Sequence, residues 1–429
     1  MGIVAPLQLI LTALALFFAI LLGGGQGGLG DTFVQMLSLC LFAILVLAGR
    51  LREDVFSRPS SPGWLACLVL VVPLLQMLPL PHYLPMQPIN AERMFWSLIP
   101  ACVIYLSVLT MEPKFQRWMA WLVMVLALAS LVLGLMQLAG GSESTLRLYE
   151  NTSSTQAVGF FANRNHLAAL FLMCLPISLA SAALIVARGD VDTPLLPLRI
   201  IAALAVAGMT IFAIAVTKSR SGLVLGMLGL LFSLPMVLSL QQRRGLKRGY
   251  LILAAIAILF TLQFAFVGVL QRLATDSGGD DRWHFSRVTL EAASESPVTG
   301  TGLGTFRHVF QIHDTTDPGR AIVNHAHNDY LELWLEARWL FLACAVVFIG
   351  LIIRSTVAVW RCPDKRHSLW AKAASISVAL MLLHSALDFP LRTTSNQAVF
   401  ALVLGILFSW RAPRTEKGFP PHDPRSFTG

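Results

Sequence analysis

The strongest constraint in this chain is a series of apolar runs, each about 17 residues or longer, the length that an α-helix needs to cross a bilayer. Of the 429 residues, 56% are apolar and only 13% are charged, against about 25% charged in an ordinary soluble domain. A soluble globule of this length would need far more polar surface. The sequence therefore predicts an all-α polytopic membrane protein and excludes a soluble enzyme, a disordered tail protein and a secreted disulfide scaffold.

Reading the runs between charged or Pro/Gly-rich breaks predicts about twelve transmembrane helices. One large loop lies between the ninth and tenth of them, and long ordered loops are usually functional. The chain then divides into spans one to nine in residues 1–270, the loop in 271–337, spans ten to twelve in 338–410 and a tail in 411–429. The spans are expected near 3–22, 33–48, 64–80, 95–111, 118–139, 167–187, 200–216, 222–240, 250–270, 338–358, 370–388 and 396–410.

The charge pattern predicts an orientation. The net charge is +9, and basic clusters follow the second, fourth, eighth and tenth spans and continue into the tail. Membrane proteins collect Lys and Arg in cytoplasmic loops, so this excess does not indicate nucleic acid. It predicts that both termini are cytoplasmic and that the loop 271–337 lies on the opposite, outer face of the membrane. The six cysteines form no CxxC pair, so we expect neither disulfides nor a zinc site.

Three cations on the outer side break this trend. Arg164, Lys218 and Arg220 lie at span ends on the face opposite the basic clusters. Charges near bilayer depth are costly and usually face a partner or a wet cavity. Because the guanidinium fork binds phosphate oxygens bidentately, these residues predict a site for a doubly charged phosphate group. The alternative is snorkelling to lipid head groups, which stays open above all for Lys218.

An amphipathic helix is expected around 281–295 within the large loop. On this stretch alone, Arg282 and Arg287 are best explained as a solvated face with local ion pairs to Asp280 or Glu291. A glycine-rich segment follows at 300–304 and is expected to form a turn, since its spacing does not match a dinucleotide-binding fingerprint.

The densest polar segment is Asn324-His325-Ala326-His327-Asn328-Asp329-Tyr330-Leu331-Glu332. Histidine is the usual general base near neutral pH, so one catalytic histidine supported by its neighbours is the favoured interpretation. Metal binding by His325, His327 and Asp329 is disfavoured, because alternate residues share a face on a strand but not on the helix that the flanking pattern predicts. The structural alternative is a helix cap, with Asn324 as the N-cap.

A last polar group lies near the outer end of the eleventh span. His384 and Asp388 are candidates to line a cavity there. Arg392 is expected to pair with Asp388, and a structural ion pair is the simpler explanation of those two residues.

Taken in order, these segments resemble the O-antigen ligase/polymerase family of bacterial membrane glycosyltransferases, over roughly residues 150–410. No single segment is specific, but their order around one large outer loop is. The segments are Asn163-Arg164-Asn165-His166, Ser219-Arg220-Ser221-Gly222, Arg282-Trp283, the turn at 300–306, His325-Ala326-His327-Asn328-Asp329-Tyr330-Leu331, and His384 with Asp388-Phe389-Pro390-Leu391-Arg392.

The resemblance implies a metal-independent transferase of the membrane-embedded (GT-C-like) class in the bacterial inner membrane, acting on the periplasmic face without a cofactor. Its donor would be a glycan on undecaprenyl diphosphate, and its acceptor either lipid A-core, for a ligase, or the end sugar of a lipid-linked glycan, for a polymerase. The family's diphosphate-binding arginines correspond to Arg220 and Arg282, with Arg164 and Lys218 as further candidates. The essential histidine corresponds to His327, with His325 as the weaker alternative. The supporting residues would be Asn328, Asp329 and Glu332.

One departure and two alternatives remain. The family commonly has Gly after the Glu that ends the helix of the His segment, whereas here Glu336 is followed by Ala337 and Arg338. A transporter or flippase of lipid-linked sugars also fits the number of spans, although the sequence has no internal repeat of the kind that many transporters show. A non-catalytic assembly partner would not need the His and Arg residues.

Overall fold

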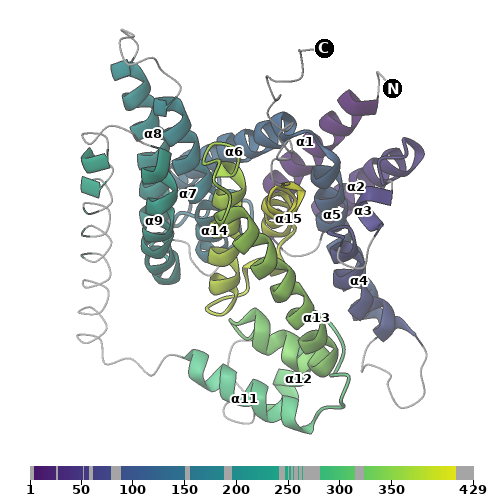
Figure 1. Cartoon of the computed structure of the whole chain (residues 1–429). Coiled ribbons are helices and arrows are strands. Elements are labelled where there is room, and N and C mark those ends of the chain that lie inside the picture. The colour runs from purple at the N-terminus through teal and green to yellow at the C-terminus, as the bar shows by residue number, and fades with distance from the viewer. Residues whose placement is uncertain are drawn as a thin grey trace, which may run out of the picture.

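The computed structural model describes residues 4–25, 28–51, 53–57, 61–78, 88–149, 155–187, 196–240, 247–249, 281–314 and 323–411, with isolated positions between 251 and 263. All regular elements in these residues are helices (Figure 1). They are α1 (Val4–Leu22), α2 (Leu29–Leu47), α3 (Glu53–Phe56), α4 (Trp64–Met77), α5 (Pro88–Thr110), α6 (Pro113–Ala139), α7 (Arg164–Ala187), α8 (Leu196–Val216), α9 (Arg220–Leu240), α11 (Asp281–Glu295), α12 (Phe306–His313), α13 (Asp329–Trp360), α14 (Leu369–Ser385), η1 (Pro390–Arg392) and α15 (Thr394–Ser409).

Length and composition show a polytopic helical membrane protein. Seven described helices are long and apolar enough to cross a membrane: α1, α2, α5, α6, α7, α9 and α13. Four shorter apolar helices are α4, the Ala205–Val216 part of α8, α14 and α15. Each of these lies on one of the predicted spans. The predicted span near 250–270 lies outside the described residues, apart from isolated positions, and so does the tail beyond 411. The number of twelve spans therefore stays a prediction.

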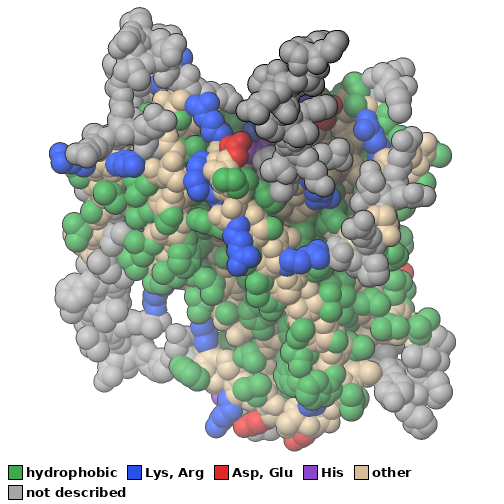
Figure 2. All heavy atoms as spheres, in the orientation of Figure 1, with side chains coloured by type: hydrophobic (Ala, Val, Ile, Leu, Met, Phe, Trp, Pro, Cys, Tyr) green, Lys and Arg blue, Asp and Glu red, His purple; other side chains and the backbone are tan. Residues whose placement is uncertain are grey.

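Helix α7 forms the centre of the bundle. In its spanning window 89% of the residues are buried, whereas in that of α13 none are. It packs against α8, α9, α14 and α15 (Figure 1). A helix that is apolar on all sides belongs in an interior or a membrane. In contrast, the surface carries many exposed large apolar side chains, and in Figure 2 hydrophobic side chains cover much of the visible face.

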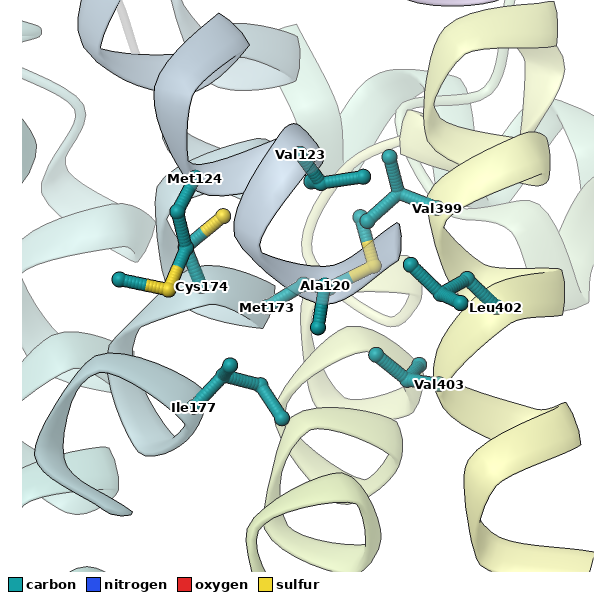
Figure 3. A pocket seen from close by; sticks show the side chains of 9 residues that line it. All are labelled: Ala120, Val123, Met124, Met173, Cys174, Ile177, Val399, Leu402 and Val403. Atoms are coloured by element: carbon teal, nitrogen blue, oxygen red, sulfur yellow. The ribbon is translucent and has the colours of Figure 1, made fainter. Parts of the chain in front are cut away.

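A small recess lies between α6, α7 and α15 (Figure 3). Its volume is about 10 Å³, which is barely room for one water molecule. It is lined by Ala120, Val123, Met124, Met173, Cys174, Ile177, Val399, Leu402 and Val403. Since every lining side chain is apolar, the recess is a packing gap in the core and offers nothing to hold a charged substrate.

The polar segments meet at one end of the bundle. The end of α1 joins the start of α15 there, where the Ser395 amide donates to the Gly23 carbonyl at 3.1 Å. The start of α7 reaches the loop after α14 through Asn165 and Asp388. Helices α11 and α12 pack against α13 at the same end, at the bottom of Figure 1. Segments that are far apart in the sequence, and that the sequence places on one side, therefore lie together.

Helix α13 contains a break that receives the glycine turn. Its N-cap is Asn328, whose side-chain oxygen accepts from two backbone amides, so the expected cap at Asn324 is wrong. Within the helix, Arg338 has φ 38° and ψ −118°. A break of this kind frees carbonyl groups one turn earlier. The Leu335 and Glu336 carbonyls are bonded instead by the amides of Thr301 and Gly302, at 3.1 and 3.0 Å.

This docking predicts that Gly300 cannot be replaced. Gly300 has φ +85°, and a Cβ there would lie 2.3 Å from the Glu336 main chain. Gly300→Ala should lower the melting temperature of the detergent-solubilised protein, because the left-handed backbone alone costs Ala about 1–2 kcal/mol and the main-chain clash adds to it. The control is Gly350→Ala in α13, where a Cβ meets nothing within 4 Å. Equal melting temperatures for both variants would contradict the docking.

Candidate active site

The first part of the site is His327 with Asp388. His327 Nδ1 lies 3.1 Å from Asp388 Oδ1, and the His327 side chain is 31% exposed while the Asp388 side chain is fully buried. The second carboxylate oxygen accepts a hydrogen bond from the Asn165 amide. An Asp that accepts from Nδ1–H orients the ring and leaves Nε2 free to take a proton. The exposed imidazole thus has the arrangement of an oriented general base.

The charge state of Asp388 supports this arrangement. Burial alone would raise the pKa of the Asp388 carboxyl, but the hydrogen bond with His327 and the charges of the surrounding imidazoles hold that pKa well below its usual range. Asp388 is therefore ionised throughout the physiological pH range. An imidazole that has gained a proton would find a charged acceptor for its Nδ1–H already in place.

His325 has a different partner. Its Nδ1 lies 3.0 Å from Glu332 Oε1, and the His325 side chain is only 14% exposed. The same carboxylate accepts from the Ala326 amide at 3.2 Å and lies 3.3 Å from Arg392. Glu332 is therefore shared between several donors. His327 is the more accessible of the two histidines, and its partner Asp388 is not bonded to an arginine among the described contacts.

Arg392 forms a buried ion cluster with one face of α13. Its guanidinium lies 3.5 Å from Asp329, 3.3 Å from Glu332 and 3.2 Å from Glu336. Spacings of three and four residues place these carboxylates on the same side of the helix. The expected pairing of Arg392 with Asp388 is thus wrong, because Arg392 turns toward α13 while Asp388 faces His327.

Aromatic rings hold the two histidines. Phe389 stacks on His325 with ring centroids 4.2 Å apart, and it meets His327 edge-on at 5.0 Å. The His327 ring is also stacked with Phe285 of α11, at a centroid distance of 6.1 Å. His327 also has φ 52°, a left-handed backbone that few non-glycine residues adopt. The loop conformation and the two phenyl rings together set the direction of the imidazole.

The Ser-Arg-Ser-Gly segment, residues 219–222, forms the start of α9, and its side chains have different surroundings. Ser219 caps the helix, since its hydroxyl accepts from the Gly222 amide at 3.1 Å. Gly222 packs so closely that an added Cβ would lie 2.8 Å from that of Ala168 on α7. Ser221 Oγ lies 3.0 Å from His384 Nε2. Arg220, the first residue of α9, is left exposed at a helix N-terminus, where the helix dipole also favours anions.

Two further predicted cations lie beside Asp388. Arg164 begins α7, is half-buried, and interacts electrostatically with Arg282 and with Asp388. Arg282, the second residue of α11, donates to the Leu387 carbonyl at 3.0 Å. Of the two partners expected for Arg282, Asp280 lies outside the described residues. The other, Glu291, lies 3.9 Å from Arg287 instead. Lys218 is exposed, in a turn with φ 53°.

These side chains, drawn from several helices and loops, converge on one region. Among the described residues, no three His, Cys, Asp or Glu side chains are arranged as metal ligands. His325 and His327 each face a separate carboxylate. The region instead combines an accessible imidazole that is oriented by a carboxylate with several guanidinium groups. This combination suits proton transfer next to an anionic group.

Residues 203–340 match the sequence model of a family described as O-antigen ligase. The predicted resemblance is confirmed for this part of the chain. The O-antigen ligase match begins in α8 and ends just after the Arg338 break in α13. It includes Arg220, Arg282, His325 and His327. Folding brings Arg164, Asp388 and Arg392 to the matched part from outside it. A search of curated proteins finds no match to the chain.

Sequence reasoning missed several members of the site. Asn165 and Ser221 stand beside arginines that were singled out, and their polar side chains at helix starts were an available signal. Glu336 was detectable from its spacing of four residues after Glu332 on the expected helix. The stacking of Phe389 and Phe285 on the histidines had no sequence signal. It depends on how helix α11 packs against the loop that follows α14.

The ion cluster predicts strong coupling between Arg392 and its carboxylates. Arg392→Leu should lower the free energy of unfolding by about 3–5 kcal/mol, since it leaves buried charges without their partner. Adding Glu336→Gln to that variant should recover part of the loss, because one of the three carboxylates becomes neutral. The measurement is the melting temperature in detergent together with the yield of inserted protein.

The matched control is Arg287→Leu. This arginine is 66% exposed and lies 3.9 Å from Glu291, so its loss should change stability by less than about 1 kcal/mol. If Glu336→Gln lowered stability equally with and without Arg392, the two side chains would not form the proposed cluster.

Proposed function

We propose that this protein transfers a glycan from undecaprenyl diphosphate to a hydroxyl group of an acceptor sugar, at the periplasmic face of the bacterial inner membrane. The acceptor is lipid A-core or a lipid-linked glycan. The observation that carries the proposal is the accessible His327, oriented by the buried Asp388, in the same region as Arg164 and Arg282. The O-antigen ligase match over residues 203–340 supports the same reaction class.

His327 acts as the general base for the acceptor. The acceptor hydroxyl is neutral and needs to lose its proton as its oxygen bonds to the anomeric carbon of the donor glycan. His327 Nε2 takes this proton, while Nδ1–H donates to Asp388. Because Asp388 remains ionised, it stabilises the imidazolium that forms. His325 is less exposed and shares its carboxylate with Arg392, so it supports the loop rather than accepting the proton.

The arginines stabilise the leaving group. The bond between the anomeric carbon and the diphosphate oxygen breaks, and its electron pair leaves with the diphosphate, which gains charge. Arg164, Arg220 and Arg282 hold the diphosphate, with Lys218 at the edge of the site. Cations placed where charge develops contribute several kcal/mol when water is excluded. No step in this scheme requires a metal ion, because the guanidinium groups supply the positive charge.

The distribution of charge supports the proposed orientation. The site residues lie at one end of the bundle, and at the other end Arg366 donates to the Ala187 carbonyl that ends α7. Arg361, Lys365 and Arg411 belong to the same end by sequence. In Figure 2 many Lys and Arg side chains gather in the upper half of the view. Since Lys and Arg are retained on the cytoplasmic side, the site faces the periplasm in the proposed arrangement of about twelve spans.

The orientation is tested by cysteine labelling. In a variant without the six native cysteines, Ser294→Cys on α11 should react with a membrane-impermeant maleimide when the outer membrane of intact cells is permeabilised. Lys365→Cys, after α13, should react only after lysis. Both positions are exposed, so accessibility within the protein does not separate them. The opposite labelling would place the site in the cytoplasm and exclude a periplasmic donor.

The base is tested by matched substitutions of the two histidines. His327→Asn should lower the rate of glycan transfer by about 10²–10⁴, while His325→Asn should have a smaller effect. Asn is chosen because it tolerates the left-handed backbone at position 327. The assay uses purified protein, lipid-linked donor and defined acceptor, with melting temperatures as a control of folding. A larger loss for His325→Asn would exchange the roles of the two residues.

The same assay separates this function from its alternatives. EDTA should leave wild-type transfer unchanged. If EDTA abolished transfer and added metal restored it, a metal-bound group rather than His327 would act as the base. A transporter or an assembly partner would show no transfer as a pure protein. Transfer to lipid A-core alone identifies a ligase, and extension of a lipid-linked glycan identifies a polymerase.

A further inference from the structure

His384 is a buried titratable residue to which the proposed reaction gives no role. It lies one turn before Asp388 at the end of α14, and its side chain is fully buried. Its Nε2 lies 3.0 Å from Ser221 Oγ, and its Nδ1 has no hydrogen-bond partner among the described residues. A buried imidazole with one unbonded nitrogen costs free energy that an apolar side chain of similar size would not. Filling the core does not explain a histidine here.

We propose that His384 and Ser221 form a positioning pair that holds Arg220 in place for the donor diphosphate. This inference rests on the proposed function and adds two residues to it. Ser221 directly follows Arg220 in the first turn of α9. The bond from Ser221 to His384 therefore fixes the rotation of α9 about its axis and the position of its first turn along that axis. Arg220 projects from this first turn. Arg220 itself is exposed, so its direction depends on the backbone that carries it.

The position of His384 explains why this tether is useful. Its carbonyl oxygen accepts from the amides of Leu387 and Asp388, both at 2.9 Å. Leu387 in turn accepts from Arg282, and Asp388 bonds to His327. One turn after α14 thus carries contacts to Arg282 and to the proposed base. The Ser221 bond adds the start of α9 to the same frame, so that the leaving-group cations and the base keep a constant separation.

This role differs from a general contribution to stability. If the pair acts through Arg220, its loss should weaken the use of the donor only while Arg220 is present. If it merely stabilises the contact of α9 with α14, its loss should have the same effect with any residue at position 220. A double-mutant cycle separates the two cases, because it measures the interaction between sites.

The experiment measures kcat and the KM for lipid-linked donor in purified protein, for Ser221→Ala and Arg220→Lys alone and together. Ser221→Ala should raise the donor KM by roughly 2- to 10-fold, the range for loss of one hydrogen bond, and leave the acceptor KM unchanged. In the Arg220→Lys background the same change should have less than about a twofold effect, since little remains to be positioned. His384→Gln, whose amide can reach Ser221, should retain more donor affinity than His384→Leu.

The control is Ser233→Ala in the same helix. Ser233 is also buried, and its hydroxyl has no hydrogen-bond partner among the described residues, so its loss should change neither KM. Equal effects of Ser221→Ala in both backgrounds, or a fall in melting temperature without a change in KM, would overturn the positioning role. A normal donor KM for Arg220→Lys would instead contradict the diphosphate clamp itself, whatever Ser221→Ala does.

Discussion

The arrangement of this site depends on one buried ion cluster. Arg392 meets three carboxylates on the first turns of α13, and burying so many charges is costly unless each is paired in good geometry. The cluster therefore tolerates few alternative positions of α13 relative to the segment before α15. Since the His325–His327 loop leads directly into α13, the same constraint determines where both histidines lie.

The charges of the site are separated in space. The acidic residues Asp329, Glu332 and Glu336 are turned away from solvent and toward Arg392, whereas Arg220 at the start of α9 is exposed. The remaining carboxylate, Asp388, is bonded to His327 and not to Arg392 among the described contacts. An incoming anion would thus meet the exposed guanidinium group of Arg220 first, while the carboxylates that fix the scaffold are buried and turned toward Arg392.

Much of this arrangement could be predicted from the sequence. Apolar runs identify spans because a bilayer leaves few other solutions. The amphipathic pattern of residues 281–295, which ends before Pro297, predicted α11. The break at Arg338 could not be predicted from local sequence. The carbonyl groups just before it, those of Leu335 and Glu336, are bonded by a turn more than thirty residues earlier in the chain. The partners of Asp388 and Arg392 were assigned wrongly for a similar reason. Arg392 is only four residues from Asp388 in sequence, but it belongs to the three-residue helix η1 and turns toward the carboxylates of α13 instead.

The turn between α14 and α15 has a consequence for genetics. Within nine residues, His384 to Arg392, the chain contacts the start of α9, Arg282, His327 and the first turns of α13. With the proposed function, a substitution in this segment would disturb donor binding, proton transfer and folding at once. Alleles that affect only one of these properties are therefore expected among the residues that the segment contacts. Substitutions within the segment itself should mostly be pleiotropic.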